Sequence, residues 1–170
     1  MRKSVFVLVG VVLFCSCAGT INTVSYINTQ SAYKKAVIIS AENSNHIRFK
    51  PGIFIPMGVY IVLPDDPAEK GEVIGDTDKV IRQELERYGI HAEIVKRGEI
   101  TDDFDLIVEY YDTWRWDMKN ILDKLEIVFI SQQGEMIAKS TYNIYKNKEI
   151  HNFPTPEKEV PKMIKELLQK

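Results

Sequence analysis

The second half of the chain carries the strongest constraint on folding, an alternation of apolar and polar residues along two segments that flank a tight turn. Residues 122–131 and 136–145 lie on either side of a Gln-Gln-Gly sequence that ends at Gly134, which predicts a β-hairpin. Ala138 and Ser140 are small, so a helix could approach one face of this hairpin closely. A sheet with one apolar face must bury that face against another layer.

A further strand is predicted over residues 104–114, immediately before the hairpin. Leu106, Val108 and Tyr110 would lie on one face of it, because successive side chains of a strand point to opposite sides. Two segments show the apolar periodicity of helices: residues 77–88, and a C-terminal segment that opens at Pro154. We expect these two helices to cover the apolar face of the sheet.

Short apolar runs in the first half predict additional strands, at residues 36–40, 47–50, 59–63 and 92–96. The first two would form a hairpin, and the uninterrupted run at 59–63 is typical of a central strand covered on both faces. From there the chain would pass through the first helix to 92–96, which is the order of a parallel crossover. The sequence therefore predicts a single α+β domain with an α/β-like start, in which a mixed sheet of about five to seven strands is covered by two main helices.

The N-terminal residues have the pattern of an export signal. Arg2 and Lys3 form a positive segment, and ten apolar or small residues from Val5 to Phe14 follow without a charge. As a helix this run would span about 15 Å, half of the ~30 Å hydrocarbon core of a bilayer. Residues 1–16 are therefore predicted to be a signal peptide and not a transmembrane helix.

The sequence Phe14-Cys15-Ser16-Cys17 resembles the lipobox of bacterial lipoproteins, with Phe14 in place of the usual Leu. The resemblance implies cleavage before Cys17 and its modification with diacylglycerol and often a further acyl chain such as palmitate, and two or more acyl chains hold a protein stably in a membrane. Ala18 stands where an Asp would favour the inner membrane, so the resemblance implies the outer membrane, on its periplasmic face. Release by ordinary signal peptidase at Ser16-Cys17-Ala18, or retention of the uncleaved segment, are the alternatives.

Composition limits what the mature chain can do. Residues 17–34 are rich in Ser, Thr, Asn and Gln and are predicted to be the lipidated cysteine and a flexible tether, which leaves residues 35–170 as the globular domain. Both cysteines lie at the cleavage region, so thiol chemistry is excluded from the domain, and no cofactor is expected. The 22 basic residues are outnumbered by 24 acidic ones even before Arg2 and Lys3 are removed, which argues against a nucleic-acid partner.

Residues 57–145 resemble small bacterial lipoproteins of unknown function. The shared elements are the pair VYIVLPDD and DTDKVIRQELERYG, the aromatic strand DLIVEYYDTWRWDM, and the hairpin LEIVFISQQGEMIAKSTYN. More distantly, the topology is similar to the periplasmic α/β domains of curli-export and penicillin-binding-protein-activator lipoproteins. That similarity is one of fold and implies no function, and the relatives offer no catalytic residues to transfer.

The aromatic strand supplies the candidate contact for a ligand or a partner, formed by Tyr110, Trp114, Arg115 and Trp116. The three rings would share one face of an extended strand, where they could stack on sugars or form a hot spot for a protein. Core packing beneath the C-terminal helix is the alternative for the same rings. Arg115 would lie on the opposite face and could pair there with Asp117.

Asp65 and Asp66 follow the strand predicted at 59–63, at the type of strand end where α/β sheets place ligands. They are candidates for acid–base chemistry, with a solvated turn between two prolines as the alternative. His46, His91 and His151 lack the spacing of metal ligands, so no metal site is predicted.

Two functions fit these observations. The first is a non-catalytic binding or scaffold module of the cell envelope, attached to the membrane by its N-terminal lipid and docked on another envelope protein or on peptidoglycan. The second is a domain that binds or hydrolyses cell-wall or dietary glycan, with Trp114 and Trp116 as the stacking platform and Asp65 or Asp66 as acids. The sequence shows no catalytic set, so the first function is favoured and no enzymatic activity is expected.

Replacing Cys17 with Ser in the full chain should abolish membrane attachment, because no acyl chain can then be added. Fractionation of cells into membrane and soluble material, with a labelled fatty acid to detect lipidation, measures this. A C17S variant that stays in the membrane fraction would overturn the lipoprotein interpretation, and a soluble wild-type protein would favour release by ordinary signal peptidase.

Overall fold

The structure is a computed structural model that describes residues 19–27, 33–41, 44–47, 53–55, 59–61, 73–100, 103–116, 119–144 and 153–169. The predicted signal peptide and Cys17 lie outside these residues. The same holds for Asp65, Asp66, Asp117 and His151, and for the side chains of His46 and Trp116.

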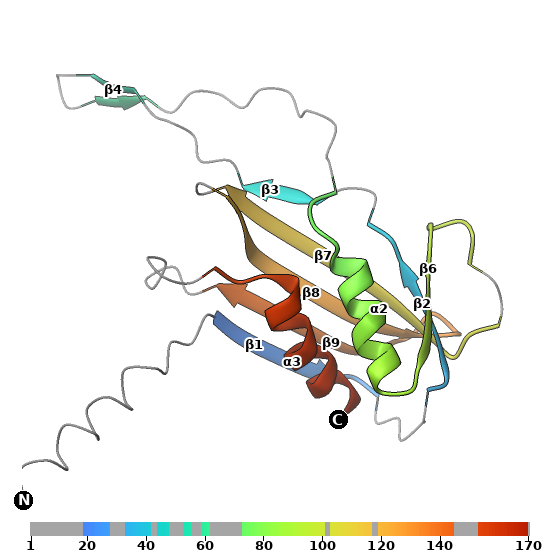
Figure 1. The fold of residues 1–170 in the computed structure, drawn as a ribbon. Coiled ribbons are helices and arrows are strands. Elements are labelled where there is room, and N and C mark those ends of the chain that lie inside the picture. Colours follow the sequence, from blue (N-terminus) through green and yellow to red (C-terminus); the bar gives the residue numbers. More distant parts are fainter. Residues whose placement is uncertain are drawn as a thin grey trace, which may run out of the picture.

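A mixed sheet forms one layer of the molecule, and two helices form the other (Figure 1). Across the sheet the order is β1 (Gly19–Ser25), β9 (Met136–Ile144), β8 (Asn120–Ser131), β7 (Leu106–Trp116), β2 (Lys35–Ile39) and β6 (His91–Val95). The first four strands are antiparallel to their neighbours, and β2 and β6 continue the sheet in parallel. This arrangement confirms the predicted mixed sheet under two main helices.

Both helices cover the same face of the sheet and lie side by side (Figure 1). The first, α2 (Thr77–Arg87), begins after Asp76 and ends before Gly89, whose φ of +78° is a conformation that glycine adopts without a Cβ penalty. The second, α3 (Pro156–Leu168), has a proline at its start and Pro161 in its second turn. Its buried residues face β9 and β8, and they include Val160, Met163, Ile164 and Leu167.

The predicted parallel crossover exists, but it starts from a different strand. It runs from β2 through α2 to β6, and β2 and β6 pair directly. Residues 59–61 form β5 (Val59–Ile61), which among the described strands pairs with β4 (Ile53–Ile55) alone, in a separate two-stranded sheet, so the prediction of a central strand there is wrong. An apolar run predicts a strand but not its partner, and the short Pro-Met-Gly connection favours local pairing.

The third strand, β3 (Asn45–Ile47), pairs in parallel with Thr113–Arg115 of β7. The sequence predicts a hairpin with the strand at 36–40, and this prediction is also wrong. The pairing follows from strand lengths, because β2 ends well before β7 does. The edge of β7 that pairs with β2 in its first half therefore pairs with β3 in its second half, which satisfies the backbone groups there.

Gly19–Ser25 forms the edge strand β1, where the sequence predicts part of a flexible tether. Thr23 is buried and donates a hydrogen bond of 2.6 Å to a carboxylate oxygen of Glu166 on α3. The Thr23 hydroxyl also lies 2.9 Å from that of Ser140 on β9. The polar composition is misleading here because an edge strand has one face in solvent, and its buried polar group is satisfied by hydrogen bonds.

Replacing Thr23 with Val should lower the free energy of unfolding by about 1–3 kcal/mol, because the buried Ser140 hydroxyl and the Glu166 carboxylate lose a partner. Thr20 is exposed on the same strand, so T20V is the matched control and should change stability by less than about 0.5 kcal/mol. Urea unfolding of both variants makes the comparison. Equal, negligible effects would mean that residues 19–25 are a tether in solution.

Candidate interaction surface

Strand β7 places Tyr110 and Trp114 on the face that the helices cover. Trp114 is only 5% exposed, and both rings belong to the hydrophobic core. A Cβ at Gly75 would lie 3.1 Å from the Trp114 ring, so the loop that leads into α2 packs closely on the indole. Both rings therefore pack in the core. The alternative for them was a place beneath the C-terminal helix, whereas the neighbour found for Trp114 is Gly75, which precedes α2.

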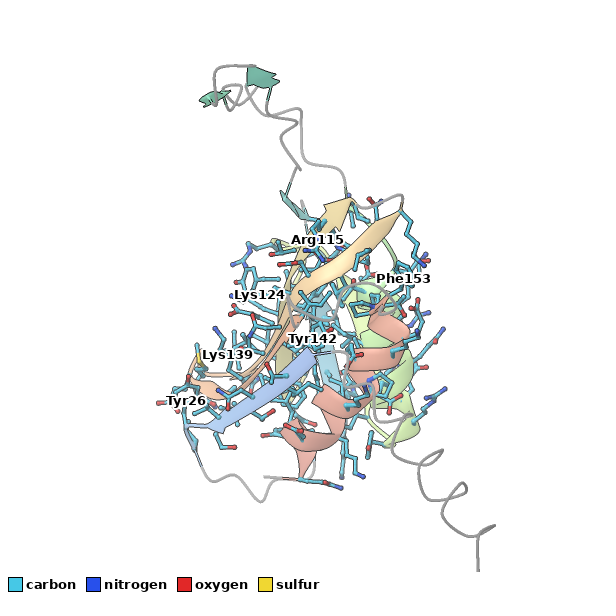
Figure 2. The ribbon with its side chains drawn as sticks, turned by 90° about the vertical axis from the view of Figure 1, so that its left-hand side faces the viewer. Tyr26, Arg115, Lys124, Lys139, Tyr142 and Phe153 are labelled. Atoms are coloured by element: carbon cyan, nitrogen blue, oxygen red, sulfur yellow. The ribbon has the colours of Figure 1, made fainter. Side chains whose placement is uncertain are left out.

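A bulge in β8 sets the surroundings of Arg115. The register between β7 and β8 shifts between Thr113 and Trp114, which leaves Asp123 as the extra residue of β8. Arg115 Nη1 lies 3.8 Å from Asp123 Oδ1, so the guanidinium faces a carboxylate of the neighbouring strand. Figure 2 shows Arg115 near the upper end of the sheet.

Hydrogen bonds to two buried side chains of β7 hold the start of α2 and the residue Ala41, which follows β2, against this strand. The Thr77 hydroxyl donates to Asp112 Oδ2 at 3.1 Å, and the Ala41 backbone N–H donates to the Tyr110 hydroxyl at 3.2 Å. Burial raises the pKa of Tyr110 to about 12, so the phenol stays neutral and keeps its hydrogen. Within the described part of the chain, Asp112 Oδ1 and Trp114 Nε1 have no hydrogen-bond partner. Tyr110 and Asp112 are buried, and the hydrogen bonds that they make to Ala41 and Thr77 connect parts of the fold.

The face of the sheet that points away from the helices carries charges. Lys124 and Lys139 place their Nζ atoms 2.8 and 3.1 Å from Glu126 Oε1, and in Figure 2 both lysines lie on the side opposite the helices. A second cluster joins Arg97 and Tyr111 to Glu109, with contacts of 2.9 and 2.7 Å. Alternation with Leu106, Val108 and Tyr110 places Glu109 and Tyr111 on this face, but it does not give the partner Arg97, which follows β6.

These contacts fix the charge state of the face. Burial raises the pKa of Glu126, but the hydrogen bonds and charges of Lys124 and Lys139 outweigh burial, and the pKa lies below its usual value. The hydrogen bond that Tyr111 donates to Glu109 raises the pKa of the phenol. At neutral pH this face therefore presents paired charges of both signs.

An exposed apolar cluster lies where β1 ends and β9 begins, and we name it the corner patch. It consists of Val24, Tyr26 and Met136, which are 42%, 56% and 44% exposed. The Tyr26 backbone N–H donates to the Ile137 carbonyl at 2.8 Å, which holds Tyr26 beside the start of β9 (Figure 2). Tyrosine and methionine are enriched in protein interfaces. Among the described strands none pairs with the outer edge of β1, so this corner also offers free backbone groups.

The described residues lack two further features that would mark a site. They contain no group of three or more His, Cys, Asp or Glu side chains arranged to hold a metal ion. Nor do they contain a helix that is long and apolar enough to cross a membrane.

Comparison with known proteins identifies the fold. The chain matches no protein-family model and no curated protein sequence. Among solved structures, it is similar to the dodecamer of a single-substitution variant of PelC from Paraburkholderia phytofirmans, with a TM-score of 0.51, 11% identity, and coverage of 88% of this chain and 98% of that chain. A PelC dodecamer of the same organism in another space group gives a TM-score of 0.47 at 12% identity, over 88% and 96% of the two chains. The first of these likenesses shows that the chain has a PelC-like fold.

The burial of Trp114 predicts a distinct fluorescence behaviour. In a Trp116→Phe variant the remaining indole should emit at short wavelength and should be quenched by acrylamide several-fold less than free tryptophan, because the ring lies in the core. The matched Trp114→Phe variant reports Trp116 alone. Ready quenching of Trp114 would show that the ring is accessible and would restore it as a stacking residue for glycan.

Proposed function

We propose that the protein is a non-catalytic scaffold module of the cell envelope that assembles with copies of itself. Lipid on Cys17 holds it in the outer membrane, on the periplasmic face. The observation that carries the proposal is the fold, which is shared with a protein whose structure is a dodecamer. The lipobox-like sequence before Cys17 supports the anchor.

The corner patch is the surface through which copies would meet. Its exposed Tyr26 and Met136 have the chemistry of an interface core, and the paired charges around Glu126 and Lys139 on the same face would form the polar rim. The two edges of the sheet differ, since one is β1 and the other is β6. A head-to-tail contact between unlike surfaces closes into a ring when the rotation between copies permits it.

The burial of Tyr110 and Trp114 favours the scaffold over the glycan-directed alternative. A stacking platform needs an exposed ring, whereas the ring of Trp114 is buried in the core. The buried Asp112 and Tyr110 are engaged with Thr77 and Ala41, which are structural contacts. Another envelope protein or peptidoglycan on the corner patch is the competing occupant, and the oligomeric state distinguishes them.

The test measures the mass of the lipidated protein in detergent by analytical ultracentrifugation. Wild-type protein should form a multimer, and Tyr26→Asp should weaken it by about thirtyfold or more, since losing an interface hot spot costs about 2 kcal/mol or more. Tyr88 is also exposed, at 45%, but lies at the end of α2, so Tyr88→Asp is the matched control. Thermal unfolding of both variants confirms that each is folded.

A monomeric wild-type protein at micromolar concentration would overturn assembly and would favour a different partner. Equal behaviour of the two tyrosine variants would overturn the corner patch as the interface.

A further inference from the structure

We infer that the sheet continues from one copy of the protein to the next, with the edge strand β1 of one copy paired to the edge strand β6 of its neighbour. This inference rests on the proposed self-assembly and names the two surfaces that meet in it. In Figure 1 β1 and β6 lie at opposite sides of the sheet. Among the described strands β1 pairs with β9 alone and β6 with β2 alone, so each has one edge without a described partner.

The outer edge of β1 carries none of the features that keep strand edges apart. Natural proteins protect such edges with charged side chains, prolines, bulges or very short strands. β1 has seven residues without a charge or a proline, and its register with β9 runs unbroken from Gly19 to Ser25. About every second residue of such a strand directs its N–H and C=O away from the paired neighbour. The edge of β1 is therefore suited to take a further strand.

The directions of the two edge strands permit this pairing. β1 is antiparallel to β9, β9 to β8 and β8 to β7, whereas β2 and β6 run parallel to β7. β1 and β6 therefore run in opposite directions, and an antiparallel pair between copies keeps the helices of both copies on the same face. Because α3 packs beside β1 and α2 beside β6, α3 of one copy would come beside α2 of the next, as the two helices do within one copy.

The side chains on the face away from the helices select the register. Val24 is 42% exposed at the β1 edge, and Val95 is half-buried at the β6 edge. Both belong to one row of side chains that crosses the sheet, and its members are Val24, Lys139, Val128, Glu109, Ile39 and Val95. With the two valines opposite each other, the apolar ends of this row meet. A shift of two residues would place Val24 opposite Glu93 or Arg97, and a shift of one would turn it to the other face.

The charges on β6 disfavour a contact between two copies of that strand. His91 and Glu93 are exposed on β6, with His91 Nε2 3.6 Å from Glu93 Oε1. If two β6 strands paired along their whole length in antiparallel order, the two Glu93 side chains would lie opposite each other. Like charges in that position destabilise a sheet. β1 has no charged residue, so Glu93 meets no like charge beside it.

Closure separates the remaining contact, between two copies of β1, from the inferred one. A pair of identical edges is a two-fold contact and closes at two copies, which would leave the outer edge of β6 unused. A contact between β1 and β6 leaves one edge of each kind at the ends of any row of copies, so further copies can be added until a ring closes. This is the head-to-tail contact of the proposed assembly.

The test links the two edges covalently through introduced cysteines. A variant with both Val24→Cys and Val95→Cys, lipidated at Cys17, is assembled in detergent and treated with a bis-maleimide that spans about 8 Å, somewhat more than the ~5 Å between the Cβ atoms of opposite residues. Denaturing electrophoresis should show a series of covalent multimers beyond the dimer. Either single variant should stay monomeric, and a mixture of the two single variants should give covalent dimers only. Wild-type protein controls for linking through the cysteines of the cleavage region.

Thr20→Cys combined with Val95→Cys is the matched control. Thr20 is exposed on the same face of β1 but lies about 13 Å from Val24 along the strand, so this pair should be linked several-fold less. Linking of the single V24C variant to itself would overturn the inference in favour of a contact between two β1 strands. Equal linking of the Thr20 and Val24 pairs would also overturn it, because the copies would then meet without a defined register.

Analytical ultracentrifugation of the unlinked proteins separates this inference from the proposed function. Monomeric wild-type protein contradicts assembly itself, whereas a multimer whose Val24 and Val95 positions stay unlinked contradicts only the contact between β1 and β6. If the double variant does not assemble, the mixture of single variants decides, since each chain then carries one substitution. Tyr88 precedes β6 and lies outside the inferred strand pair, so it remains the control for the corner patch.

Discussion

The burial of one face of the central strands β7 and β8 under both helices is the constraint on which the rest of the structure depends. Leu106 and Val108 of β7, Ile127 of β8, Ile81 of α2 and Ile164 of α3 are fully buried. Burial of each such side chain stabilises the folded state by about 1.5–3 kcal/mol. Together these contributions oppose the conformational entropy lost on folding. Because α2 and α3 cover the same face, every other feature is arranged around a two-layer structure whose second sheet face is covered by no described helix.

The uncovered face and the strand edges follow from this constraint. A sheet face without a helix layer must be compatible with solvent, and the ion pairs of Glu126 and Glu109 make it so. The edge at β1 is tied down by Thr23 and Glu166, while Tyr26 and Met136 beside it stay exposed. The same strand begins two residues after Cys17, the residue that we propose carries the lipid. The charged face and the exposed corner thus occupy different places on one small domain.

The sequence predicted those elements whose signals are local. The helix at 77–88 has an apolar stripe and a terminal glycine, and the strands around Gly134 flank a turn, so both were found within a residue or two. Alternation also predicted that Leu106, Val108 and Tyr110 share one face of β7. The partners of residues 45–47 and 59–61 were not, because pairing depends on which strand edges remain free after the whole sheet has formed. The polar strand β1 was missed because its hydrogen bonds come from residues more than a hundred positions away.

The candidate site divides in the same way. The sequence by itself determined the lipobox-like cysteine, the absence of other cysteines and the aromatic strand, since these depend only on residue types and their order. Only the tertiary structure decided that Trp114 and Tyr110 belong to the core and that Tyr26 and Met136 are exposed. A pattern of period two assigns residues to two faces but does not say which face the helices will cover. The helices and the sheet come from segments far apart in the chain. The helices cover the sheet face whose burial removes the larger apolar area from water.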